Sequence, residues 1–327
     1  MHPIRLLRLA SLVLAVLAAP QARADDYPIT IHHAFGTTVI DSKPQRIATV
    51  NWANHEVPLA LGVVPVGFAR ANFGDDDGDG LLPWVTEALR ALGAPPPPLF
   101  DEGDGIDFEA VAAARPDVIL AAYSGLSEND YRILSRIAPV VASPGAPWST
   151  GWRQMIEMNS EGMGMAAEGR ALVARLEARI ADTRAAHPEF EGRRALFVTH
   201  LAANDLSRIS FYTDNDARVR FFHDLGLGSP QMVHDASASG AFSAQVSAET
   251  IDALADVDVM VSYGGPALRE GLKANRLTAH LPAVERDALV LLGNDPTGTA
   301  ANPTPLSLPW VLDAYADMLS SALRGAP

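Results

Sequence analysis

Two tyrosines offer the clearest binding chemistry in the sequence. Tyr123 and Tyr263 each follow a short apolar run, and each begins a Tyr-x-Gly triplet. Apolar runs of this length are typical of strands buried in a parallel sheet. Ligands of such sheets bind outside the carboxyl ends of the strands, so both rings are candidates for ligand contact. The alternative is a buried strand-end tyrosine whose hydroxyl is hydrogen bonded within the protein.

Tryptophans and arginines extend this candidate site. Aromatic walls hold bulky ligands with flat faces, and guanidinium groups supply counter-charge to anionic ones. The candidates follow predicted strands or lie in loops and at helix starts: Trp52, Trp84, Trp148, Arg70, Arg208 and Arg218. For Arg208 the alternative is a surface ion pair with Asp205 or Asp216, and for Arg218 it is exposure on a helix over 218–225.

The sequence indicates neither catalysis nor a resident metal. It has no cysteine, P-loop or G-x-G-x-x-G turn, and residues 236–240 (ASASG) lack the first glycine of a hydrolase G-x-S-x-G. Asp75–Gly80 begins like a calcium loop, but Thr86 stands where that loop needs glutamate. We therefore predict no catalytic residue, metal ligand or cofactor, and leave open whether Asp75–Gly80 holds a cation.

A repeat shows which elements position these residues. Phe108–Gly125 matches Ala248–Gly265 at a constant offset of 140, pairing Glu109 with Glu249 as well as the two tyrosines. Each copy predicts a short helix with glutamate in its first turn, followed by a buried strand. Chance similarity between generic helix–strand units is the alternative. The pattern predicts two Rossmann-like α/β lobes, residues 25–150 and 189–327.

The segment between the lobes predicts one long helix. From Ala166 to Ala186 apolar residues recur with helical spacing, and Pro188 ends the pattern. A helix of this length is roughly 32 Å long, enough to connect two lobes. We assign 151–188 to this linker region.

Composition and the first residues point to export. The 327-residue chain has a net charge of −14, which argues against nucleic-acid binding. Residues 1–24 carry a basic start, a short apolar run and an Ala-x-Ala end, as a cleavable signal peptide does. Cleavage after Ala24 removes three arginines and no acid, so the mature charge becomes −17. We expect a periplasmic protein that is neither membrane-inserted nor, lacking cysteine, a lipoprotein.

Several motifs together resemble a known family. They are Ile29–Arg46, His55–Phe68, Phe108–Leu120, Val246–Val261 and Ala300–Leu308. In order and spacing they are similar to the helix-linked periplasmic substrate-binding proteins of ABC transporters for ferric siderophores, haem and cobalamin. The resemblance implies two α/β lobes joined by one long helix, ligand in the cleft, and no catalysis. It also places Arg208 in a ligand-contacting loop, Leu201–Ser210.

The resemblance implies partners as well. One exposed glutamate per lobe, here Glu109 and Glu249, would dock on the two subunits of an inner-membrane ABC permease, although a first-turn glutamate also suits the helix dipole. We expect a monomer that binds a ferric siderophore. Within the family the chain is most similar to the siderophore branch that includes catecholate binders, so catecholate is favoured over hydroxamate. Some hydroxamate binders of the family carry an arginine before the glutamate helix, and Asp101–Gly105 (DEGDG) has none, which also counts against hydroxamate. Haem or cobalamin, direct Zn²⁺ or Mn²⁺ binding through His55, His200 and Asp295, and a metal-dependent periplasmic enzyme remain alternatives.

Overall fold

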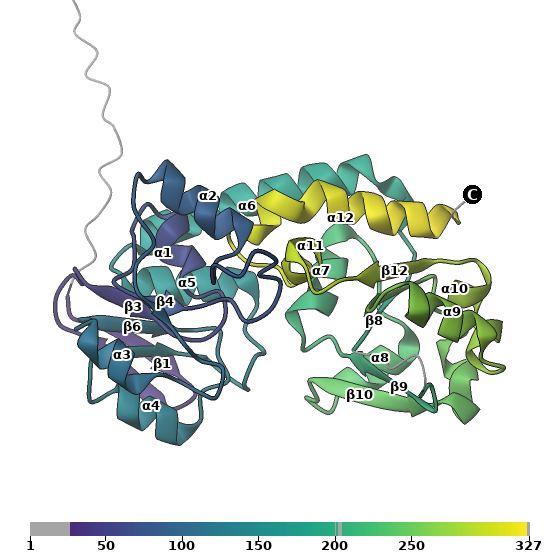
Figure 1. The fold of residues 1–327 in the computed structure, drawn as a ribbon, viewed down its shortest axis with the longest axis horizontal. Helices are drawn as coiled ribbons and strands as arrows, with labels where there is room; N and C mark the ends of the chain where they lie inside the picture. Colours follow the sequence, from purple (N-terminus) through teal and green to yellow (C-terminus); the bar gives the residue numbers. More distant parts are fainter. Residues whose placement is uncertain (1–26, 200, 202–204, 326–327) are drawn as a thin grey trace, which may run out of the picture.

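The computed structural model describes residues 27–199, 201 and 205–325. The predicted signal peptide lies outside these residues. Among them, no helix has both the length and the apolar character that a bilayer span requires. The described chain forms two α/β lobes side by side (Figure 1), which confirms the predicted fold class.

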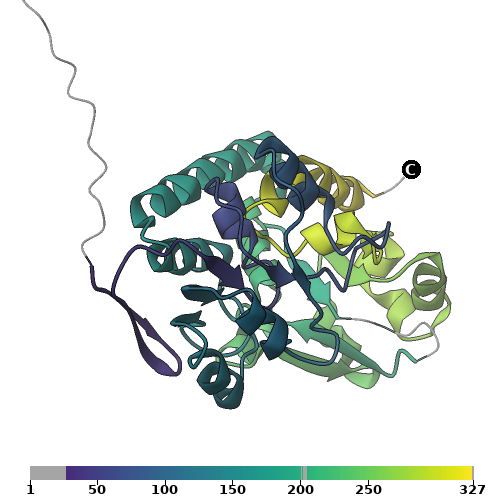
Figure 2. The same cartoon turned by 60° about the vertical axis from the view of Figure 1, so that its left-hand side comes forward.

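The first lobe is built on short parallel strands. A three-stranded sheet has the order β3 (Ile47–Thr49), β6 (Val118–Ala121) and β7 (Val140–Ala142). The pair β4 (Phe68–Ala69) and β5 (Leu99–Phe100) lies beside β3. The remaining elements are the hairpin β1 (Ile29–His33) and β2 (Gly36–Ile40), α1 (Glu56–Ala60), α2 (Pro83–Ala91), α3 (Phe108–Ala113) and α4 (Glu128–Leu134). Figure 2 shows the hairpin at the outer edge of this lobe.

The second lobe contains a five-stranded mixed sheet. Its order is β10 (Ser243–Ser247), β9 (Arg208–Tyr212), β8 (Ala195–Val198), β11 (Val259–Tyr263) and β12 (Leu289–Leu292). The last three of these are parallel, whereas β9 and β10 run antiparallel to their neighbours. The helices are η1 (Pro188–Phe190), α7 (Ala217–Leu225), α8 (Gln231–Ser237), η2 (Ala248–Leu254), α9 (Pro266–Ala274), η3 (Thr278–His280), α10 (Pro282–Glu285) and α11 (Pro296–Ala300).

Helix α6 (Ala166–Ala186) joins the lobes as predicted, and a second long helix, α12 (Ser307–Arg324), lies beside it and contacts both lobes. Helix α6 covers the span predicted from sequence and follows α5 (Trp152–Gly162). Helix α12 is tied to it by an ion pair between Arg179 and Asp313 (Figure 1). In Figures 1 and 2, α12 begins beside α2 of the first lobe and ends over the second. The C-terminal segment that the sequence placed wholly in the second lobe therefore also contacts the first.

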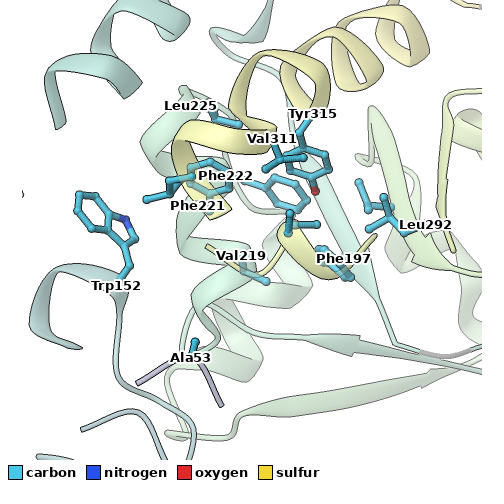
Figure 3. Packing of buried hydrophobic residues seen from close by; sticks show 14 of the residues in the cluster. Ala53, Trp152, Phe197, Val219, Phe221, Phe222, Leu225, Leu292, Val311 and Tyr315 are labelled. Carbon is cyan, nitrogen blue, oxygen red and sulfur yellow. The ribbon is translucent and has the colours of Figure 1, made fainter. Parts of the chain in front are cut away.

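The core beneath α12 is aromatic. Phe221 and Phe222 of α7 are fully buried, and the Phe221 ring stacks on Tyr315 of α12 at 6.2 Å between centroids. The Phe222 ring stacks on Phe197 of β8 at 5.9 Å between centroids, so α7 packs between the sheet and α12 (Figure 3). This arrangement fixes α7, which carries Arg218, against the second-lobe sheet.

The repeat appears as a pair of equivalent units with one difference. In both, a helix leads into a parallel strand whose carboxyl end carries the matched tyrosine. In the first unit Asp107 caps α3 by accepting a hydrogen bond from the Ala110 amide. The corresponding Ser247 is paired in β10, and η2 is a 3₁₀ element that is interrupted at Thr250.

A buried amide fixes the carboxyl end of β6. The Asn54 side chain donates to the carbonyls of Val50 (2.9 Å) and Tyr123 (2.8 Å), and its oxygen accepts from the Tyr123 amide (3.0 Å). Asn159 of α5 donates a further hydrogen bond to the same oxygen (3.0 Å). Asn54 is fully buried, so each partner depends on it for a hydrogen bond.

We predict that Asn54→Ala lowers the free energy of unfolding by about 3 kcal/mol, because several buried polar groups lose their partner at once. Asn129→Ala, which changes an exposed asparagine on α4, should change it by less than about 0.5 kcal/mol. Urea unfolding followed by circular dichroism measures both. Equal stability of the two variants would contradict the role given to Asn54.

Candidate ligand-binding site

A cavity of about 210 Å³ opens in the first lobe. Its walls come from the loop after β3, the start of α1, the loop after β4, and the segments around residues 102 and 148. Of the predicted site residues, Trp52, Arg70 and Trp148 line it; other lining residues are Asn51, His55, Glu56, Phe68, Leu82 and Glu102. It is smaller than the 300–1,000 Å³ typical of whole-ligand pockets, so it suits part of a bulky ligand.

A strained loop forms one wall of this cavity. Asn51 and Ala53 have left-handed backbone conformations, with φ of 59° and 60°, and such conformations concentrate at functional sites. Glu102 holds the loop by accepting hydrogen bonds from the amide and side chain of Asn51, both at 3.0 Å. Burial raises the pKa of Glu102, against the effect of these hydrogen bonds. The loop therefore presents Trp52 from a fixed position.

Two titratable neighbours form the floor of the cavity. His55 stacks on Phe68 at 4.4 Å, and burial lowers its pKa to about 3. Glu56 accepts hydrogen bonds from the Trp84 indole (2.7 Å) and from the Leu306 amide at the start of α12 (2.8 Å). Burial raises the pKa of Glu56 to about 7 despite these bonds. The neutral forms of both side chains are thus favoured inside the protein.

Tyr123 and Tyr263 both lie between the lobes, and both rings are buried, with 6% and 7% of their surface exposed. Tyr123 packs edge-on against Trp148 at 5.4 Å, and its hydroxyl accepts a hydrogen bond from Asn302 (3.2 Å). Tyr263 packs edge-on against Phe73 of the first lobe at 5.6 Å. Burial raises the pKa of Tyr123 to about 12, so its phenol is neutral and acts as a hydrogen-bonding aromatic surface.

Arg218 lies in the same cluster. Its guanidinium pairs with Asp216 at 2.7 Å, lies 3.8 Å from the ring centre of Tyr212, and is 3.4 Å from the Tyr263 hydroxyl. Burial opposes ionisation, but the hydrogen bonds and charge of Asp216 raise the pKa of Arg218 well above its ordinary value. The arginine is therefore charged, but its charge is balanced by Asp216.

Two predicted contact residues lie elsewhere. Trp84 is buried, with its indole bonded to Glu56 and its ring 5.2 Å from Trp310, so it supports the cavity from behind. Arg208 is exposed on β9, where it bonds Gln245 (3.2 Å). It shares a strand face with Tyr212 but is about 13 Å further along the strand. Part of its loop, 202–204, lies outside the described residues.

The remaining acidic candidates are on the surface. Glu109 is exposed in the first turn of α3; the Glu249 side chain lies outside the described part of the chain. In the Asp75–Gly80 loop, Asp75 accepts hydrogen bonds from the amides of Gly78 and Gly80, each at 2.8 Å. The carboxylates of Asp75, Asp77 and Asp79 gather within 4.8 Å of one another.

Comparison with known proteins identifies the fold. Residues 47–296 match the family model described as "Periplasmic binding protein". The chain belongs to this family. The predicted recognition is thereby confirmed, as is the expectation of a substrate-binding protein and not an enzyme.

Solved structures of the family agree. The structure of PiaA from Streptococcus pneumoniae in complex with ferrichrome is 39% identical, with a TM-score of 0.87 over 91% of this chain and 100% of that one. SirA of Staphylococcus aureus complexed with staphyloferrin B, at 20% identity and a TM-score of 0.68 over 89% of this chain and 98% of that one, shares the fold.

Curated relatives are more distant. The ferric enterobactin-binding periplasmic protein FepB of Escherichia coli is 25% identical over 88% of this chain and 91% of its own. The probable siderophore-binding lipoprotein YfiY of Bacillus subtilis is 25% identical over 62% of this chain, and the match spans 58% of that protein.

Sequence reasoning missed three polar residues of the site, the buried Glu56 and the half-buried Glu102 and Asn302. Each lies in a segment that the sequence assigned to a loop or a family motif without giving the side chain a role. A glutamate at the start of the apolar segment Val57–Leu61 was a usable signal, because a buried helix carries a carboxylate only where donors meet it.

We predict that Glu56→Gln changes the pH dependence of stability. The pKa of Glu56 is raised from 4.5 to about 7 on folding, so the folded state holds a proton that the unfolded state has lost. The free energy of unfolding of the wild-type protein should therefore fall with rising pH, and the variant should gain about 2 kcal/mol relative to wild type between about pH 5 and 7. Thermal or urea unfolding across this range tests it; parallel curves would mean that Glu56 does not titrate there.

Proposed function

We propose that this protein is a periplasmic receptor that captures a ferric siderophore and delivers it to an inner-membrane ABC importer. The observation that carries the proposal is the convergence of Tyr123, Trp148 and Tyr263 between the lobes beside the first-lobe cavity. Membership of the periplasmic binding protein family and the siderophore ligands named for its relatives support it.

The charge of the site favours a chelate of low charge. Arg218 is balanced by Asp216, and Arg70 is the one arginine among the described residues that line the cavity. Three singly charged hydroxamates cancel the charge of Fe³⁺, whereas three doubly charged catecholates leave the complex strongly anionic. Burying such an anion here would lack compensating cations. We therefore propose a ferric hydroxamate, in place of the catecholate that the sequence favoured.

The similarity to PiaA supports the same choice, because that structure holds ferrichrome. The residues that counted against hydroxamate in the sequence are Asp101–Gly105, which lack an arginine. In the structure this stretch supplies Glu102, which holds the Asn51 loop of the cavity. The segment therefore has a structural role that does not depend on the charge of the ligand.

Two connecting helices suggest how the receptor works. Because α6 and α12 both run from one lobe to the other, the lobes can change their angle only slightly when the ligand binds. We propose that recognition depends on a largely preformed cleft. The exported, monomeric state and the absence of a lipid anchor remain predictions, since YfiY is named a lipoprotein.

The test is a ligand screen on the mature protein. Ferrichrome should quench tryptophan fluorescence and raise the melting temperature, because a ligand that binds only the folded state stabilises it. Ferric enterobactin should bind at least about tenfold more weakly, which corresponds to about 1.4 kcal/mol. Haem, cobalamin, Zn²⁺, Mn²⁺ and Fe³⁺ without chelator should have no effect. Binding of none of the chelates would sink the proposal, and preferential binding of haem or bare metal would replace it.

A pair of arginine variants locates the site. Arg70→Gln removes the cavity cation and should weaken ferrichrome binding about tenfold, through loss of a charge-assisted hydrogen bond to the chelate. Arg90→Gln changes an exposed arginine on α2 outside the cavity lining and should bind as wild type does. Equal affinities of the two variants would place the ligand elsewhere.

We also propose that Glu109 and Glu249 dock on the permease, one per lobe. Reversing both charges, Glu109→Lys with Glu249→Lys, should abolish siderophore uptake in cells and leave affinity for the chelate unchanged. Glu128→Lys, an exposed reversal on α4, serves as control and should retain uptake. Normal uptake in the double variant, or a loss of affinity, would contradict this role.

A further inference from the structure

One loop of the first lobe reaches across to the second. We call residues 71–82, between β4 and α2, the clasp loop. Its two ends form part of the cavity wall, through Ala71 and Asn72 on one side and Gly80 and Leu82 on the other. Its tip leaves the first lobe, so one short segment connects the cavity to the opposite lobe.

Among the described residues, the loop contacts the second lobe through Phe73 and Gly74. The Phe73 ring packs edge-on against Tyr263 at 5.6 Å and an interplanar angle of 83°. The Gly74 amide donates a hydrogen bond to the Asn294 side chain at 2.7 Å. Both partners lie at the carboxyl ends of parallel strands, β11 and β12, where ligands of α/β sheets bind.

The contact at Gly74 is close enough to require glycine. Its φ is +76°, a conformation that side chains rarely adopt, and a Cβ added there would lie 1.8 Å from Thr299 Oγ1 and 2.7 Å from Thr299 Cβ. The Thr299 hydroxyl is buried against it and has no hydrogen-bond partner among the described residues. An unsatisfied hydroxyl weakens the closed contact, because opening the loop would expose it to water.

We propose that the clasp loop is a gate to the cavity, which must release from the second lobe before a ligand enters or leaves. It closes equally over the empty and the occupied cavity, so it sets the rates of exchange and not the affinity. This inference rests on the proposed function, since it takes the cavity as part of the ligand site. The tight glycine contact holds the gate shut, while the unpartnered threonine hydroxyl limits how firmly it stays shut.

The chain offers a matched pair of variants to test the gate. Gly74→Ala and Gly78→Ala both place alanine at positive φ in the same loop, but only the first meets another residue; Gly78 has open space around it. In Gly74→Ala the association and dissociation rate constants for ferrichrome, measured by stopped-flow fluorescence, should both rise about tenfold as the open fraction rises. The dissociation constant should stay within about threefold. Gly78→Ala should match wild type.

Hydrogen exchange provides a readout that needs no ligand. Amides of residues 71–80 should exchange faster in ligand-free Gly74→Ala than in Gly78→Ala, because the bond to Asn294 is lost. If Gly74→Ala folds poorly, Asn294→Ala can replace it in the test. It removes the acceptor of the Gly74 hydrogen bond without adding volume, and it should also speed exchange of the loop amides. Equal exchange in the two glycine variants would show that the Gly74 contact does not hold the clasp loop closed. A rise in the dissociation rate constant without a rise in the association rate constant would show that the loop is not a gate. Failure of the wild-type protein to bind any ferric siderophore would instead refute the proposed function.

Discussion

The buried side-chain amide of Asn54 makes hydrogen bonds to three parts of the first lobe, and the geometry of the candidate site depends on these bonds. It ties the end of β3 to the end of β6 and both to α5. Because the bonds go to backbone groups of Tyr123, the position of that ring follows from the amide and not from the ring's own contacts. The strained Asn51–Ala53 loop lies directly before Asn54, so the same residue anchors the cavity wall.

Much of the architecture could be predicted because it depends on local patterns. Helix α6 has its predicted bounds, because its apolar residues recur with helical spacing and Pro188 prevents the helix from continuing. The two tyrosines were found because each follows a buried strand of an internal repeat, and a parallel sheet puts both at carboxyl ends. Trp52 and Trp148 could be placed in loops near those ends for the same reason.

The rest depends on contacts between distant residues, which no local pattern encodes. In the sequence Trp84 and Trp52 look alike, since each lies in a loop or at a helix start. In the structure the Trp84 indole donates a hydrogen bond to Glu56, and the Trp84 ring is buried in the core. The sequence identified Arg218 as a candidate cation of the site, but it did not predict that Asp216 balances its charge. The absent arginine that counted against hydroxamate lies in one segment, whereas the charged residues of the site come from four separate segments.

The bond between Glu56 and Leu306 has a consequence for the order in which this protein matures. It joins residues 250 apart in sequence. The ring contact between Trp84 and Trp310 likewise joins the early and late parts of the chain. Because synthesis begins at the N-terminus, the early half of the chain appears without the segment that covers its buried carboxylate. The first lobe therefore completes its fold only when the last portion of the chain is present.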